Sequence, residues 1–278
     1  ANTRVLSADQ MVALGAAQLA ALTTSQFAGL SSANVTALSR TQIGQIQTTG
    51  LVAIATANMQ AISTAQLLAL STAQLLALTT AQVKALTSAQ LNALDSDQMG
   101  AVETADINAL TTAQVVALTS DQVSSLKTAQ LASLSTAQIA VIETDDLVTL
   151  STAQIRGLTT AQVASLTTDQ LVTMGTDQVA AFTTTQITAL TTKQVVALTT
   201  DQAAVLTTAQ VVALTTSQVS NLTTAQLAGM TTKQVAAMET DDIQAVTTAQ
   251  LVALTTAQVA AMTTDQVVAL TTSQVSNL

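Results

Sequence analysis

The sequence predicts an all-α fold, a solenoid of short helices of five or six residues with one helix in each octapeptide. Three observations predict it. From Ser7 to Leu278 the chain divides into 34 octapeptides without an insertion or deletion. Every octapeptide carries an apolar residue at its fifth and eighth positions, and the fourth position is Gln in 28 of them. Repetition at a fixed period is typical of architectures in which each unit packs on its neighbours.

The octapeptide from Thr207 to Leu214, with the sequence TTAQVVAL, shows why each unit is expected to be helical. Thr at position one suits a helix N-cap, and Gln at position four can complete the capping box by bonding back to the cap amide. The Leu before the cap and the Val at position five lie where a hydrophobic staple packs. Each unit is therefore expected to be one short helix that ends where the next cap begins.

The alternative secondary structure is a β-solenoid, because Thr and Val favour strands. A strand separates odd from even positions, which here would mix Leu and Val with Gln and Thr. A helix at about 100° per residue instead places positions five and eight on one side and positions three and six on the other. Helices this short are not stable alone, so stacking must stabilise them.

A second period of 24 residues indicates three helices per coil. In every third unit, starting from Thr23, position three is almost never Ala. The residues there are Ser25, Thr49, Ala73, Asp97, Asp121, Asp145, Asp169, Lys193, Ser217, Asp241 and Asp265. The pattern predicts a triangular, rod-like solenoid with one polar edge and two Ala-rich edges. Two units per coil is the alternative.

The repeats suggest one continuous solenoid with two regions. Residues 1–62 hold irregular units, with Gly15, Arg40 and Gly50 at unusual positions, and are expected to form a cap or a contact region. Residues 63–278 hold the regular units. The last unit repeats residues 215–222 and offers an apolar end, so we expect either that the array continues in a longer protein or that another copy packs on this end.

Composition argues against several classes of function. The chain has no His and no Cys, so the commonest catalytic base, the thiol nucleophile and the soft metal ligands are missing. We therefore expect no enzyme, no catalytic residue, no cofactor-binding residue and no small-molecule substrate. Seven Lys and Arg leave no basic patch for nucleic acid. Apolar runs are far shorter than the ~20 residues of a membrane-spanning helix.

Acidic residues are the only candidates for a binding site. The polar edge carries Asp97, Asp121, Asp145, Asp169, Asp241 and Asp265, where an Asp in a first helical turn is also favoured by the helix dipole. Three units combine Glu at position one with Asp at position four: Glu103 with Asp106, Glu143 with Asp146, and Glu239 with Asp242. We interpret them as capping variants. If a cation such as Ca²⁺ binds, the candidate ligands are Glu143, Asp145, Asp146, Glu239, Asp241 and Asp242.

The repeated hexapeptide of Ala189 to Gln194, ALTTKQ, resembles repeat tracts in large secreted or surface proteins of bacteria. The resemblance implies an extracellular or cell-surface structural role and carries over no catalytic residue. We therefore predict a non-catalytic structural protein: a protomer of an extracellular filament, sheath or surface layer, or a spacer in an adhesin. Such a protein would be a homo-oligomer or filament. The alternative is a binding module whose polar edge takes up a cation, carbohydrate or ice.

Overall fold

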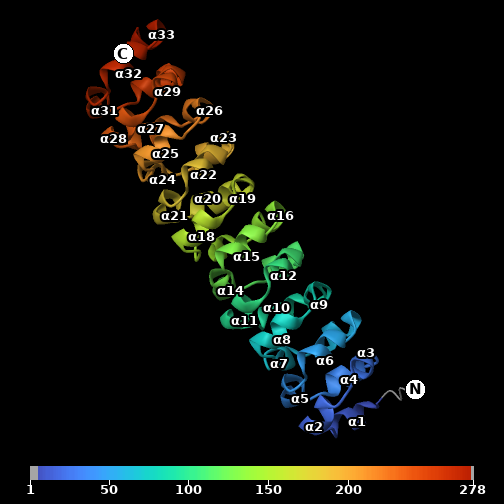
Figure 1. Ribbon diagram of the computed structural model, residues 1–278. Coiled ribbons are helices and arrows are strands. Elements are labelled where there is room, and N and C mark those ends of the chain that lie inside the picture. The colour runs from blue at the N-terminus through green and yellow to red at the C-terminus, as the bar shows by residue number, and fades with distance from the viewer. Residues whose placement is uncertain (1–5, 277–278) are drawn as a thin grey trace. The chain divides into compact units, whose positions relative to one another are not determined.

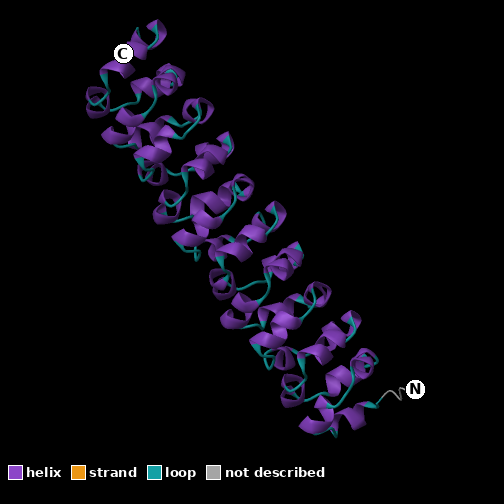
Figure 2. Ribbon diagram, in the orientation of Figure 1, coloured by secondary structure: helices purple, strands orange, loops and turns teal. Residues whose placement is uncertain are grey.

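The computed structural model describes residues 6–276, which form 33 α-helices and one 3-10 helix, with no strand in that range (Figures 1 and 2). The chain divides into two compact units, Ala1–Ile142 and Glu143–Leu278. None of the helices within residues 6–276 is long and apolar enough to cross a membrane. The all-α prediction with one short helix per octapeptide is confirmed, and the helices have four to six residues.

The helices of the first unit are α1 (Ala8–Val12), α2 (Ala16–Ala20), α3 (Thr24–Ala28), α4 (Ser32–Ala37), α5 (Arg40–Gly44), α6 (Thr48–Ala53), η1 (Thr56–Ala61), α7 (Thr64–Leu67), α8 (Thr72–Ala77), α9 (Thr80–Ala85), α10 (Ser88–Asn92), α11 (Ser96–Ala101), α12 (Thr104–Ala109), α13 (Thr112–Val116), α14 (Ser120–Ser125), α15 (Thr128–Ser133) and α16 (Thr136–Ile139).

Those of the second unit are α17 (Thr144–Leu147), α18 (Thr152–Gly157), α19 (Thr160–Ser165), α20 (Thr168–Thr173), α21 (Thr176–Ala180), α22 (Thr184–Ala189), α23 (Thr192–Ala197), α24 (Thr200–Ala204), α25 (Thr208–Val212), α26 (Thr216–Ser220), α27 (Thr224–Gly229), α28 (Thr232–Ala237), α29 (Thr240–Ala245), α30 (Thr248–Val252), α31 (Thr256–Ala260), α32 (Thr264–Ala269) and α33 (Thr272–Val275).

Most helices start at the predicted capping box; α6, η1, α12, α17 and α29 do not. In α25 the Gln210 amide donates to Thr207 Oγ1 at 3.2 Å, and the Thr207 amide donates to Gln210 Oε1 at 2.7 Å. The Gln half of the box persists where position one has no hydroxyl. The Gly15 and Gly175 amides donate to the Gln Oε1 of their own units at 2.9 and 3.0 Å. Gln is therefore the more constant half of the cap.

The core is built from positions five and eight, as the helical periodicity predicts. In α25 and the corner after it, Val211 is 0% exposed and Leu214 is 5% exposed. The last turn closes with a hydrogen bond to the residue three places earlier, here from the Leu214 amide to the Val211 carbonyl at 3.1 Å. Because each helix has at most six residues, stability comes from this buried row and from contacts between coils.

Three helices make one coil. Within each unit, helices pack against those three places before and after them, as in α11 with α14, α12 with α15, and α24 with α27. The predicted 24-residue coil is confirmed in both units. Each unit therefore has three columns of stacked helices, and one of those in the second unit runs through α17, α20, α23, α26, α29 and α32.

The Gln side chain also joins successive coils, which the capping box alone does not require. Its Nε2 group donates to the position-eight carbonyl 28 residues earlier, as from Gln210 to Phe182 at 2.6 Å and from Gln218 to Leu190 at 2.7 Å. Further bonds of Gln218 reach the carbonyls of Ile187 and Thr188. These Gln side chains are buried, so their amides form an internal hydrogen-bond ladder.

Polar residues at position six add a second kind of bond between coils. Asn92 Nδ2 donates to the Ala117 carbonyl at 2.9 Å, and Thr188 Oγ1 donates to the Ala213 carbonyl at 2.9 Å. In both cases the acceptor lies 25 residues later, at position seven of the next coil. A polar side chain at position six can thus stabilise the stack while lying at its surface.

The irregular N-terminal octapeptides retain the three-helix coil although other residues replace Gln at position four. At position four of its unit, Gly50 has no side chain, and the Phe27 ring from the coil below fills the space: a Cβ on Gly50 would lie 2.5 Å from Phe27 Cε2. Asn58 replaces Gln in η1, and its Nδ2 still donates to the Leu30 carbonyl at 2.7 Å. The predicted contrast between residues 1–62 and 63–278 falls inside the first unit and remains a prediction.

Removing one ladder amide should cost more stability than removing one cap hydroxyl. We expect Gln218→Ala to lower the free energy of unfolding by about 2–4 kcal/mol, since it leaves buried carbonyls without a donor. Thr215→Ala in the same unit should cost about 1 kcal/mol. Denaturant unfolding of both variants measures the difference, and equal losses would show that the ladder contributes nothing beyond the cap.

Gly50 and Phe27 should behave as a coupled pair. Gly50→Ala places a methyl group against the aromatic ring and should destabilise the chain by about 1–3 kcal/mol through overpacking. In the Phe27→Leu background the same substitution should cost less, because the ring is gone. A double-mutant cycle in thermal unfolding measures this coupling. Additive effects would contradict the proposed packing.

Candidate functional site

Acidic residues gather on one column of helices in the second unit, whereas in the first unit they are divided between two columns. In the second unit the acidic column is the one that contains α17, α20, α23, α26, α29 and α32. It carries Glu143, Asp145, Asp146, Asp169, Glu239, Asp241, Asp242 and Asp265, whereas the other two columns carry only Asp177 and Asp201. The predicted polar edge therefore corresponds to a real column.

The acidic column is not polar throughout. Val172 and Val196 occupy position six on α20 and α23, and Val148 occupies position six directly after α17; they are 44%, 43% and 43% exposed. Asp145 and Asp169 lie at position three on α17 and α20 and are exposed as well. The edge thus combines charge at position three with exposed apolar side chains at position six.

In each of the three octapeptides that combine Glu with Asp, the Glu side chain is exposed and the Asp side chain is buried. Glu103, Glu143 and Glu239 are exposed, whereas Asp106, Asp146 and Asp242 are 2%, 5% and 2% exposed. None of the three Glu side chains caps its helix. The interpretation as capping variants is therefore wrong for Glu. For Asp242 it holds in part, because its carboxylate accepts from the backbone of Glu239.

Burial disfavours the charged form of the position-four Asp side chains. It raises the pKa of Asp106, and the nearby Glu103 charge adds to this, while the Thr80 hydroxyl opposes it. Burial likewise raises the pKa of Asp242, with help from the charges of Glu239 and Asp241 and against a hydrogen bond from Thr216. Both hydroxyls lie 26 residues earlier, one coil below.

Asp242 also has an oxygen without a partner. Its Oδ2 is the only buried side-chain nitrogen or oxygen atom within residues 6–276 that lacks a hydrogen bond. In the same range no group of three or more acidic side chains is arranged to hold a metal ion by itself. Any cation at Glu239, Asp241 and Asp242 would therefore need other ligands, such as backbone carbonyls.

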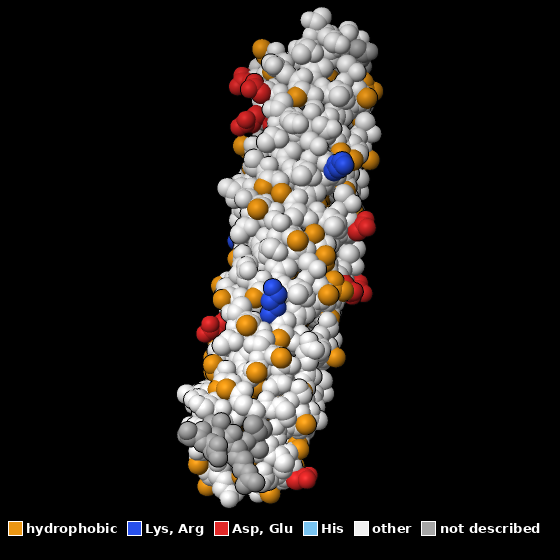
Figure 3. Space-filling view, turned by 90° about the vertical axis from the view of Figure 1, so that its right-hand side faces the viewer, with side chains coloured by type: hydrophobic (Ala, Val, Ile, Leu, Met, Phe, Trp, Pro, Cys, Tyr) orange, Lys and Arg blue, Asp and Glu red, His pale blue; other side chains and the backbone are white. Residues whose placement is uncertain are grey.

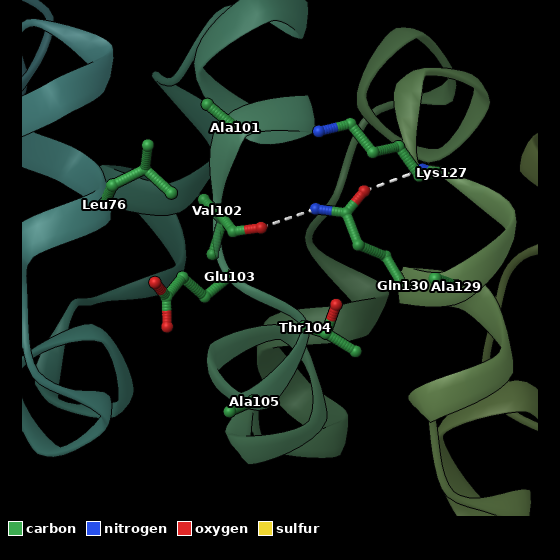
Figure 4. A pocket seen from close by; sticks show the side chains of 9 residues that line it. All are labelled: Leu76, Ala101, Val102, Glu103, Thr104, Ala105, Lys127, Ala129 and Gln130. Carbon is green, nitrogen blue, oxygen red and sulfur yellow. Dashed lines mark hydrogen bonds between the residues drawn. The ribbon is translucent and has the colours of Figure 1, made fainter.

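A shallow hollow of about 360 Å³ lies beside the octapeptide that holds Glu103 and Asp106, in the first compact unit (Figure 4). Glu103 and Lys127, the position-one residues of successive coils, line it on opposite sides. Figure 4 shows Lys127 extending toward Ala101, while the Glu103 carboxylate lies on the side of Leu76. Gln130 bonds the Val102 carbonyl at 2.6 Å in its wall. The hollow is thus a gap between coils that the ladder crosses.

The surface view shows how sparse charge is on one face of the molecule (Figure 3). Acidic side chains lie close together at the upper left, the other charged side chains stand apart, and hydrophobic side chains are scattered among uncharged ones. Across the whole chain only 8% of residues are charged. The face shown in Figure 3 therefore carries no broad charged patch.

Sequence reasoning found the acidic residues but missed the ladder and the burial of Asp106, Asp146 and Asp242. A signal for the ladder was present. A capping box accepts Glu as readily as Gln at position four, yet the chain never places Glu there. Of these two side chains, only the Gln amide both accepts a hydrogen bond and donates one, which is the requirement that the ladder imposes.

The repeat matches a known family. A model described as the ALTTAQ repeat matches residues 51–88, 72–104, 99–136, 139–176, 171–208, 188–216 and 235–272. The chain belongs to the ALTTAQ repeat family. The hexapeptide that names the family spans positions seven and eight of one unit and positions one to four of the next, so an ALTTAQ repeat contains the helix cap and the ladder residue together. Comparison with curated proteins gave no significant match.

The raised pKa of Asp106 predicts a pH-dependent stability. Because its folded pKa lies above the unfolded value, the carboxyl weakens the fold at neutral pH and ceases to do so as the pH falls through the folded pKa. Asp106→Asn should be more stable than the natural chain by about 1 kcal/mol at pH 7, since an amide can donate to the Leu78 carbonyl.

That advantage should shrink as the pH approaches 4. Denaturant unfolding of both proteins at several pH values measures it. An advantage that stays constant, or grows on acidification, would contradict the assignment of a raised pKa to Asp106.

Proposed function

We propose that this ALTTAQ repeat protein is a non-catalytic structural element, a protomer of an extracellular filament, sheath or surface layer, or a spacer in an adhesin. The observation that carries the proposal is the Gln ladder, which ties each coil to the one below through buried hydrogen bonds such as Gln226 to Leu198 at 2.6 Å. An array built this way repeats one stabilising contact along its length, which suits a load-bearing part.

The use of side chains within each unit supports the same proposal. Position one caps, position four forms the ladder, and positions five and eight form the core, so these four positions are committed to the stack. The exposed positions carry mainly small Thr and Ala side chains. Seven Lys and Arg in the whole chain leave few cleavage sites for trypsin-like proteases, which favours survival outside a cell.

Lateral packing is proposed to use a nearly uncharged column. In the second unit the column of α19, α22, α25, α28 and α31 carries a single charged residue, Lys233. Its exposed position-three residues include Ala161, Ala209 and Ala257. Two such columns can approach with only one Lys side chain from each column to accommodate, whereas two acidic columns would repel each other.

Imaging and sedimentation test the proposal. The purified chain should form filaments, sheets or defined oligomers as its concentration rises, seen by negative-stain electron microscopy and sedimentation velocity. The double variant Ala209→Glu with Ala257→Glu should assemble at least about tenfold less readily, because burying unpaired carboxylates is costly.

Ser217→Glu, an exposed position on the acidic column, is the matched control and should assemble normally. A chain that stays monomeric at every concentration would contradict assembly through this column. Equal effects of the alanine and serine variants would show that added charge alone, rather than the uncharged column, controls the association.

A further inference from the structure

The corner at Asp242 differs from its neighbours because a carboxylate stands where the ladder needs an amide. Gln234 and Gln250, at position four of the units before and after, donate to the carbonyls of Leu206 and Leu222, at 2.7 and 2.5 Å. The same register pairs position 242 with the Leu214 carbonyl, 28 residues earlier. An ionised Asp has no hydrogen to donate. The ladder therefore lacks its amide donor at this corner, as it does at the other two position-four Asp residues.

A side chain of this length can reach that carbonyl. Asn has the same shape as Asp, and at position four Asn34 and Asn58 place Nδ2 at 2.8 and 2.7 Å from the carbonyls 28 residues earlier. The Asp242 oxygen that corresponds to this Nδ2 has no hydrogen to share with Leu214. The unpartnered Oδ2 is buried, and Asp242 itself is 2% exposed. If Oδ2 takes the place of this Nδ2, it and the Leu214 carbonyl are both acceptors, and a cation between them would satisfy both.

The surroundings supply further negative charge. Glu239 at position one and Asp241 at position three are exposed and act electrostatically on Asp242. Carboxylates and backbone carbonyls are the ligands that Ca²⁺ prefers, with water completing a shell of six to eight oxygens. No Lys or Arg lies in the 239–246 unit to neutralise the three carboxylates.

We propose that Glu239, Asp242 and the Leu214 carbonyl form a binding site for one Ca²⁺ ion. The ion replaces the missing amide of the ladder: it binds Asp242 Oδ2 and the carbonyl together, and Glu239 closes the site from the solvent side. Asp241 strengthens the attraction through its charge. With so few protein ligands, the dissociation constant should be on the order of 10⁻⁴–10⁻³ M, the range of extracellular calcium modules.

The proposal is confined to this corner. Residues 143–146 have the same sequence as residues 239–242, but Asp146 is not without a partner. Asp106 has Ala105 rather than an acidic residue at position three, and neither of its oxygens is a buried atom without a hydrogen bond. The site extends the proposed structural function, because a bound ion would stiffen one coil junction.

Calcium binding to the full chain and its variants tests the site. Equilibrium dialysis with Ca²⁺ alone should show one bound ion fewer per chain in Asp242→Asn than in the natural chain. The variant should fold, because Asn serves the ladder at two natural positions. Asp265→Asn, which removes an exposed charge from the same column one coil later, is the matched control and should keep the natural stoichiometry.

Thermal unfolding gives a second readout. Millimolar Ca²⁺ should raise the melting temperature of the natural chain more than that of Asp242→Asn, and EDTA should remove the difference. Equal binding stoichiometry in the two proteins would overturn the proposal. So would a stability difference between them that changes with pH but not with Ca²⁺, since a proton shared between Asp242 and Leu214 would then be the positive species.

Discussion

The structure depends on one side chain that serves two hydrogen-bonding partners at once. At position four, Gln accepts a bond from the cap amide of its own unit through Oε1 and donates through Nε2 to a carbonyl one coil below. Gln194 shows both, with bonds of 2.7 Å from the Thr191 amide and 2.8 Å to the Leu166 carbonyl. The same residue therefore starts a helix and fixes how that helix sits on the previous coil.

This double requirement explains what the chain tolerates at position four. Asn34 keeps both functions with a shorter reach, because its Oδ1 accepts from the Ser31 amide and its Nδ2 donates to the Leu6 carbonyl, whereas Asn58 keeps only the ladder bond. Gly50 has no side-chain amide, and the Phe27 ring occupies the space where that side chain would lie. Asp keeps only the acceptor, so at Asp106 and Asp242 a buried carboxyl with a raised pKa replaces a satisfied amide. The departures from the repeat are thus where the structure can respond to protons or cations.

Within the octapeptide, the positions that determine stability differ from those that determine the properties of the surface. The buried positions repeat with little change, while positions three and six vary, and in the second unit acidic residues concentrate on one column of helices. Substitutions at the exposed positions can therefore change the surface without disturbing the core. The hexapeptide that names the family contains the cap and the ladder residue together with the exposed residues at positions two and three.

The sequence by itself determined the helical octapeptide, the cap at position one, the core at positions five and eight, and the three-helix coil. These features rest on hydrogen bonds within four residues and on a period that composition reveals at position three. Only the tertiary structure decided that Gln218 reaches Leu190, that Phe27 fills the space beside Gly50, and that Asp242 is buried while Asp241 is exposed. Those contacts join residues 23 to 31 apart, or depend on them, and the geometry of stacked coils sets them rather than any local pattern.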